Sequence, residues 1–246
     1  MSAAAAAATM AVALDADGHV HSTWSDGTAT PAQNVAAAHA AGLRQLVMVD
    51  HVRRSTEWLP GFVRAVEVLR RDAGLLLRCG VEAKILDDRG TLDLPRDLSG
   101  VDVILVADHR MPLPSGPAAP EAVRAALAGG TLDPRWLIER LVAATLAALE
   151  APRPVVVAHL FSILPKVGLR EADVPDEAIA RLADRCRETG AVVELNEKWA
   201  TPGPRTLTIL HQRGAGLVAG SDAHAPDAVG RWDHVAALTA GLVAGS

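Results

Sequence analysis

The chain has 246 residues, of which 50% are hydrophobic and 22% charged, and its formal net charge is −5 at pH 7. This composition excludes a disordered chain, which combines low hydrophobicity with a high net charge, and the length allows a sizeable buried core. The longest basic runs are the pairs Arg53-Arg54 and Arg70-Arg71, so a dedicated nucleic-acid-binding surface is not expected.

Strand-like and helix-like segments alternate along the chain after a low-complexity N-terminal tail at residues 1–10. Strands are expected at 13–21, 43–51, 75–86, 101–109, 154–159, 191–197 and 217–224. Helices are expected at 31–42, 61–74, 121–130, 134–150, 175–190, 206–214 and 227–243, and the Pro-rich connection 112–120 is expected to be a loop. This alternation predicts a parallel sheet covered by helices, because right-handed crossovers place helices on the sheet face.

No linker-like change of composition divides residues 11–246, so a single α/β domain is expected. A closed or nearly closed barrel fits seven strands in one domain. An open, doubly wound sheet is the alternative, but no Gly-rich phosphate-binding loop follows the first predicted strand. The sequence therefore favours the barrel.

The two cysteines, Cys79 and Cys186, lie far apart and form no CxxC motif, which is typical of a protein from a reducing compartment. No apolar run reaches the roughly 18–20 residues that a membrane span needs. We therefore expect a cytoplasmic protein without membrane association. The sequence does not indicate an oligomeric state.

Histidines and acidic residues gather where the predicted strands end. The carboxyl ends of parallel strands in α/β barrels are where active sites form. Residues two apart on a strand point the same way, so His19 and His21 share one face, as do Asp222 and His224. The candidate metal ligands are His19, His21, Asp26, His51, Glu82, His109, His159, Asp222 and His224.

Imidazole and carboxylate ligands without thiolates favour a catalytic site for Zn, Mn or Fe over a Cys-rich structural zinc site. A catalytic ion takes about three protein ligands, so this set could hold two or three divalent ions, with Glu82 free to bridge two of them. The remaining histidines, His39, His211 and His234, lie in predicted helices, where packing or surface roles are expected.

The motifs resemble the polymerase and histidinol phosphatase (PHP) family of metal-dependent phosphoesterases. They are DGHVHSTWSDGT (17–28), Asp50-His51, GVEAKIL (80–86), ADHR (107–110), AHL (158–160), ELN (194–196) and GSDAH (220–224). The amidohydrolase superfamily also opens with His-x-His. The early Asp50-His51 pair and the closing Asp222-x-His224 favour the PHP family.

The resemblance implies a distorted (βα)7 barrel with a two- or three-metal cluster at the carboxyl ends of its strands. It also implies three groups of ligands. These are His19, His21, Glu82 and Asp222; then Glu82, His109 and His159; then Asp26, His51 and His224. Glu82, Asp222 and His224 are expected to be catalytic, and Asp17 is expected to orient a ligand imidazole from behind.

The activity that the resemblance implies is hydrolysis of a small-molecule phosphomonoester by metal-activated hydroxide. A histidinol phosphate-like and a nucleotide-like substrate are both compatible with the sequence. Polar residues near the motifs are expected to bind this substrate, namely Arg53, Lys84, Arg110, Asn196 and Lys198. An amidohydrolase-type C–N hydrolase and a non-catalytic metal-binding barrel are the alternatives.

Overall fold

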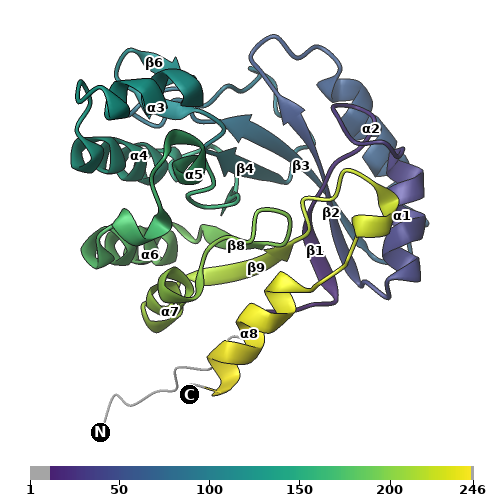
Figure 1. The fold of residues 1–246 in the computed structure, drawn as a ribbon. Helices are drawn as coiled ribbons and strands as arrows, with labels where there is room; N and C mark the ends of the chain where they lie inside the picture. Colours follow the sequence, from purple (N-terminus) through teal and green to yellow (C-terminus); the bar gives the residue numbers. More distant parts are fainter. Residues whose placement is uncertain (1–11, 245–246) are drawn as a thin grey trace, which may run out of the picture.

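A sheet of seven parallel strands forms the centre of the molecule (Figure 1). The computed structural model describes residues 12–244. The strands are β1 (Ala16–Val20), β2 (Gln45–Val52), β3 (Leu76–Lys84), β4 (Val103–Ala107), β7 (Val155–Val157), β8 (Val192–Asn196) and β9 (Gly216–Gly220). Their spatial order follows their order in the chain, as strand–helix–strand units with right-handed crossovers allow.

The first and last strands meet and nearly close the sheet into a barrel. Just beyond the ends of β1 and β9, the His21 amide donates to the Ala223 carbonyl at 2.8 Å, and the Ala223 amide donates to the His19 carbonyl at 3.3 Å. Val20 and Ala223 also form a parallel bridge. The predicted barrel is confirmed, and the open-sheet alternative is wrong.

Helices surround the barrel (Figure 1). They are α1 (Pro31–Ala40), α2 (Leu59–Arg70), α3 (Pro120–Ala128), α4 (Pro134–Ala148), α5 (Ile163–Val167), α6 (Asp176–Thr189), α7 (Pro204–Gln212) and α8 (His234–Ala244). A capping box between Thr30 and Gln33 begins α1, and Gly190 ends α6 in a left-handed conformation. No helix among residues 12–244 is long and apolar enough to cross a membrane.

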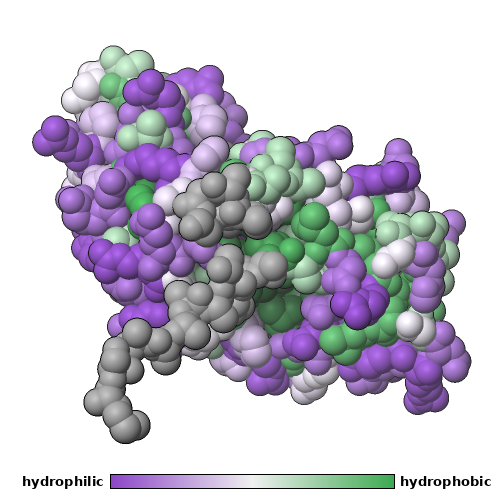
Figure 2. All heavy atoms as spheres, turned by 90° about the horizontal axis from the view of Figure 1, so that it is seen from below, coloured by the Kyte–Doolittle hydropathy of each residue, from purple (hydrophilic) through white to green (hydrophobic). Residues whose placement is uncertain are grey.

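Alternation along each strand separates two faces. On β3, Leu77, Cys79 and Val81 belong to the large apolar layer that packs under the helices. A second apolar cluster, containing Val47, Val49, Val103, Leu105 and Val156, fills the opposite side of the sheet. Towards the carboxyl ends of the strands, this inner side carries polar side chains instead, which is where the functional site lies. Seen from below, hydrophilic residues border a band of hydrophobic ones (Figure 2).

The structure corrects three local expectations. The segment expected to be a loop at 112–120 contains an antiparallel hairpin of β5 (Met111–Leu113) and β6 (Gly116–Ala118). The short helix α5 was not predicted. The last helix begins at His234 rather than 227, because a 3-10 turn at Pro226–Ala228 and Gly230, with φ of 64°, interrupt the segment. The predicted tail at 1–10 lies outside the described residues.

Candidate metal centre

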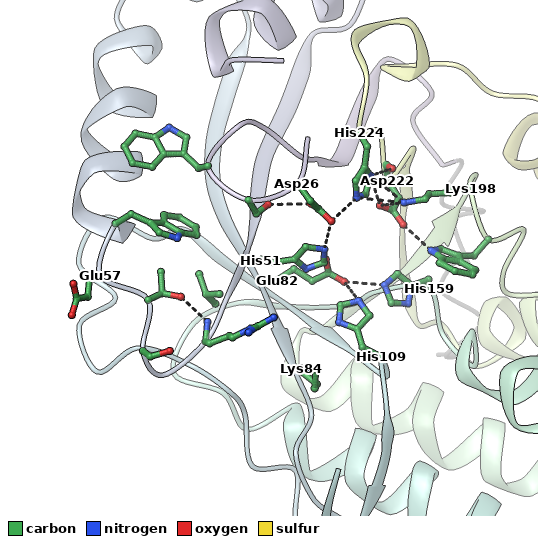
Figure 3. Close-up of a pocket in the computed structure, with 18 residues that line it drawn as sticks. Asp26, His51, Glu57, Glu82, Lys84, His109, His159, Lys198, Asp222 and His224 are labelled. Carbon is green, nitrogen blue, oxygen red and sulfur yellow. Dashed lines mark hydrogen bonds and ion pairs between the residues drawn. The ribbon is translucent and has the colours of Figure 1, made fainter. Parts of the chain in front are cut away.

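The strand ends bring seven of the nine predicted ligands to the wall of one cavity of about 920 Å³ (Figure 3), and His19 and His21 lie buried behind that wall against Glu82. The side chains come from β1, β2 and β3 and from the segments that follow β1, β4, β7 and β9. His19, His21, Glu82 and His159 are at most 2% exposed. Buried ionisable side chains are costly unless they are paired or bound to a metal, so this cluster requires partners.

Glu82 lies at the centre of the cluster. One carboxylate oxygen, Oε1, lies 2.9 Å from His159 Nε2 and 3.0 Å from His109 Nε2. The other, Oε2, lies 2.9 Å from His51 Nδ1. One carboxylate therefore faces imidazoles that come from three different strand ends.

The His-x-His pair approaches Glu82 from β1. The Nε2 atoms of His19 and His21 are 2.9 Å apart, and each lies 3.4 Å from Glu82 Oε2. Asp222 Oδ1 lies 3.4 Å from His21 Nε2. The expectation that both rings share one face is confirmed, and both rings point at the central carboxylate.

Asp26 reaches the cluster from a loop after β1. Its carboxylate oxygens lie 3.4 Å from His51 Nε2, 3.4 Å from His224 Nε2 and 3.7 Å from His21 Nδ1. Half of its side chain is exposed, unlike that of Glu82. The loop position thus places a carboxylate on the solvent side of the cluster.

The donor atoms fit divalent cations. Among the described residues, the buried His21 Nδ1 and Glu82 Oε2 make no hydrogen bond. Ligand atoms lie within 4.8 Å of one another in three groups, which are His21, Asp26, His51 and His224; His19, His21 and Glu82; and His51, Glu82 and His109. Nitrogen and oxygen donors at such spacing are suited to Zn, Mn or Fe. The groups overlap at His21, His51 and Glu82, whereas only Glu82 is shared in the expected grouping.

Proximity shifts the pKa values of the cluster in opposite directions. Burial raises the pKa of Glu82, but the charges of His109 and His19 outweigh it and hold that pKa well below its usual range. Burial lowers the pKa of His21 to about 4. The pKa of His159 rises to about 10 against burial, because Asp108 and Glu82 stabilise the charged ring. The carboxylates are therefore held ionised, as metal ligands must be.

Sequence reasoning missed a carboxylate behind the cluster, Glu194 on β8. It is 1% exposed, and it accepts hydrogen bonds from His19 Nδ1 at 2.8 Å and from the backbone amide of His159 at 2.6 Å. The signal was present in the motif ELN, since Glu194 lies two residues before Asn196 and so shares its inward face.

Two further buried carboxylates support the site. Asp108 accepts a hydrogen bond from Ser162 Oγ at 2.9 Å, and the same Oγ lies 2.9 Å from His159 Nδ1. Asp50 accepts four hydrogen bonds from the amides and hydroxyls of Ser22 and Ser25. Burial raises its pKa to about 6 despite these bonds. Asp50 thereby holds the loop that carries the neighbouring Asp26.

Asp17 does not touch an imidazole, so its expected role is wrong. Its carboxylate accepts hydrogen bonds from the backbone amides of His19, Ser221 and Gly230. Burial raises its pKa although these bonds lower it. Asp17 thus fastens β1 to the segment after β9 and holds the cluster indirectly.

The predicted substrate-binding residues divide into two sets. Arg53, Lys84 and Lys198 line the cavity. Arg110 is exposed and is not part of the cavity wall. Asn196 is fully buried: its side-chain amide donates to Glu194 Oε2 at 3.0 Å, and its side-chain oxygen accepts from the backbone amide of Trp199 at 2.8 Å. Direct binding of substrate by Asn196 is therefore corrected to a supporting contact.

Comparisons with known proteins agree with the motifs. The chain aligns at 25% identity over 239 residues with a probable phosphatase from Thermoanaerobacter sp. strain X514, covering 88% of this chain and 82% of the relative. It aligns at 27% identity over 222 residues with the DNA polymerase/3′-5′ exonuclease PolX of Bacillus subtilis, covering 86% of this chain but 34% of the relative. No family model matches the sequence.

The fold is that of a histidinol phosphate phosphatase from Lactococcus lactis, solved with zinc, L-histidinol and phosphate. The two structures superpose with a TM-score of 0.64 over 93% of this chain and 91% of the other, at 16% identity. The resemblance to the PHP family is confirmed by these relatives together, and it extends over most of the chain.

Proposed function

We propose that this protein is a metal-dependent phosphoesterase that hydrolyses a phosphomonoester of a small molecule. The observation that carries the proposal is the central Glu82, whose two oxygens face five imidazoles at 2.9–3.4 Å inside an open cavity. Two or three ions of Zn, Mn or Fe would be held by His19, His21, Asp26, His51, Glu82, His109, His159, Asp222 and His224.

Bound divalent ions supply Lewis acidity, lower the pKa of water and stabilise the charge of a transferring phosphoryl group. The chain's own part is to hold the ions and the phosphate. Glu82 and Asp222 would contribute negative charge at the centre of the ion cluster, and His224 would bind an ion on its solvent side. These three residues are catalytic because they would hold the ions that act on the substrate. Glu82 and Asp222 are both ionised, because neighbouring imidazoles hold the pKa of each carboxyl below its usual range.

Lys198 is the side chain best placed to bind the reacting phosphate. Its Nζ lies 3.4 Å from Asp222 Oδ1 and 3.1 Å from His224 Nδ1, on the wall of the cavity. Trp199 holds the same carboxylate from the other side, since its indole N–H donates to Asp222 Oδ2 at 2.9 Å. Arg53 and Lys84 line another part of the wall and would bind further phosphate oxygens.

The cavity volume of about 920 Å³ is in the range of small-molecule sites. The Lactococcus lactis relative is named for histidinol phosphate, so a histidinol phosphate-like substrate is the first to test. A nucleotide-like substrate is the second, because Trp24 and Trp58 line the cavity with their rings 5.9 Å apart and present an apolar surface to a leaving group.

The proposal is tested with a panel of phosphomonoesters and a parallel panel of amides and cyclic amides, each with Mn, Zn or Fe added. We expect phosphate release, and we expect Glu82→Ala to abolish it. Turnover of the amides alone would replace the proposal with an amidohydrolase-type activity. A folded, metal-loaded protein that turns over neither panel would identify a non-catalytic metal-binding barrel.

A further inference from the structure

Glu194 is a buried carboxylate whose two oxygens are both engaged by the metal centre's own strands. Oε1 lies 2.8 Å from His19 Nδ1, at the end of β1. Oε2 accepts from the backbone amide of His159, beyond β7, at 2.6 Å and from Asn196 Nδ2 at 3.0 Å. A single side chain from β8 therefore connects two predicted ligands from two other strands.

The space for this carboxylate is built into the neighbouring strand. Gly220 on β9 pairs with Asn196, and a Cβ at Gly220 would lie 1.9 Å from Glu194 Oε1 and 2.8 Å from its carboxyl carbon. Only a residue without a side chain leaves room here. The Glu194 carboxylate and the gap at Gly220 are therefore complementary.

The hydrogen bond to Glu194 determines the tautomer of His19. A carboxylate oxygen can only accept, so Nδ1 of His19 must carry the hydrogen. When the ring is neutral, as a metal ligand must be, its lone pair is then on Nε2, the atom that lies 3.4 Å from Glu82 Oε2. In that form Nε2 and the Glu82 oxygen could bind the same cation from two sides.

His159 is held at two points. Its backbone φ of 29° is unusual for a residue other than glycine, and the bond from its amide to Glu194 supports that conformation. Its Nδ1 lies 2.9 Å from Ser162 Oγ, which itself donates to Asp108, so the hydroxyl accepts from Nδ1–H. With Nδ1 held in this way, Nε2 of His159 points at Glu82 Oε1, 2.9 Å away.

We propose that Glu194 is the positioning residue of the metal centre: it sets the Nδ1–H tautomer of His19 and fixes the backbone of His159, so that both Nε2 atoms are presented to the ions beside Glu82. The proposal rests on the proposed function, because it concerns the same ions. It goes further by identifying one residue that touches neither substrate nor ion and on which two ligands depend.

The variant that tests it is Glu194→Gln. Three donors converge on Glu194, but glutamine has one oxygen and its amide nitrogen would face a donor, so one side of the network must break. The matched control is Glu197→Gln. Glu197 also accepts three hydrogen bonds, from the backbone amides of Asp233, His234 and Val235 at the start of α8, and it does not line the cavity.

The readouts are zinc affinity by calorimetry and the tautomer of the neutral His19 ring. The tautomer is read by ¹⁵N NMR of the full, metal-free chain labelled at histidine, with the pH raised until the ring is neutral. We expect Glu194→Gln to lower zinc affinity by about 10- to 100-fold and to lose the Nδ1–H signature. Glu197→Gln is expected to change neither. Wild-type affinity together with an unchanged tautomer in Glu194→Gln would overturn the proposal.

The wild-type protein tests the proposal even if Glu194→Gln does not fold, since a neutral His19 ring that carries its hydrogen on Nε2 instead of Nδ1 would also overturn it. A wild-type chain that binds no divalent ion would contradict the proposed function itself. The two failures are therefore distinguishable.

Discussion

Gly220→Ala perturbs the metal centre without touching any predicted ligand. The new methyl group would lie 1.9 Å from Glu194 Oε1, far inside contact distance. The backbone cannot move away freely, because Gly220 pairs with Asn196 and its carbonyl accepts from the Glu197 amide at 2.9 Å. The Glu194 carboxylate must therefore leave its place.

The expected loss of stability follows from the bonds that the carboxylate makes. Displacing it breaks its hydrogen bonds to His19, to the His159 amide and to Asn196, all of them buried. Breaking a buried charged network costs about 3–5 kcal/mol. In a domain of this size each kcal/mol lowers the midpoint of thermal unfolding by about 2–4 °C, so a fall of about 6–20 °C is expected.

The assay is thermal and urea unfolding of both proteins in chelator, followed by zinc titration. Gly241→Ala in α8 is the matched control, because no atom of the part of the chain that the structure describes lies within 4 Å of a Cβ there. It should stabilise the chain by up to about 1 kcal/mol, as Ala does in a helix. A Gly220→Ala protein as stable as the wild type, with unchanged zinc affinity, would refute the reasoning.

Three further predictions concern other parts of the chain. Burial raises the pKa of the Cys79 and Cys186 thiols from 9.0 to about 12. Both thiols should therefore resist iodoacetamide at pH 8, and the free energy of unfolding should fall as the pH rises from 9 towards 12. Rapid labelling of the folded chain would contradict this. Asp50→Ala should lower the free energy of unfolding in urea by about 1–3 kcal/mol for each buried donor left unpaired. It should also weaken metal binding, because Asp50 holds the loop that carries Asp26. Unchanged stability would show that the loop does not depend on Asp50. Lys198→Ala should lower kcat/KM for phosphomonoesters on the order of 10- to 100-fold, and an unchanged value would remove this lysine from the phosphate site.

The sequence predicted the seven strands and the convergence of their polar ends because both follow from local pattern. Continuous apolar runs such as the one ending at Asp50-His51 indicate buried parallel strands, and the barrel then brings their ends together. Spacing of two residues correctly placed His19 with His21 on one face. The short helix α5 and the β5–β6 hairpin carry no such pattern, because three- to five-residue elements depend on tertiary contacts.

The supporting carboxylates were harder to predict, since their partners come from distant strands. Glu194 and His19 are 175 residues apart in the chain, and only barrel closure brings them into contact. Asp17 illustrates the reverse error. Its spacing from His19 suggests a contact with a ring, yet its carboxylate binds backbone amides across the β1–β9 junction. The two-residue alternation of a strand predicts which way a side chain points, but it does not identify the groups that the side chain contacts.

Phosphate release measured before and after removal of metal ions tests directly whether the chain is a metal-dependent phosphoesterase. One preparation is assayed as purified, after chelation, and after Mn, Zn or Fe is restored, with the His19→Ala/His21→Ala double variant in parallel. We expect release that disappears on chelation, returns with at least one of the ions, and is absent from the double variant. Full release by the chelated protein or by the double variant would contradict it.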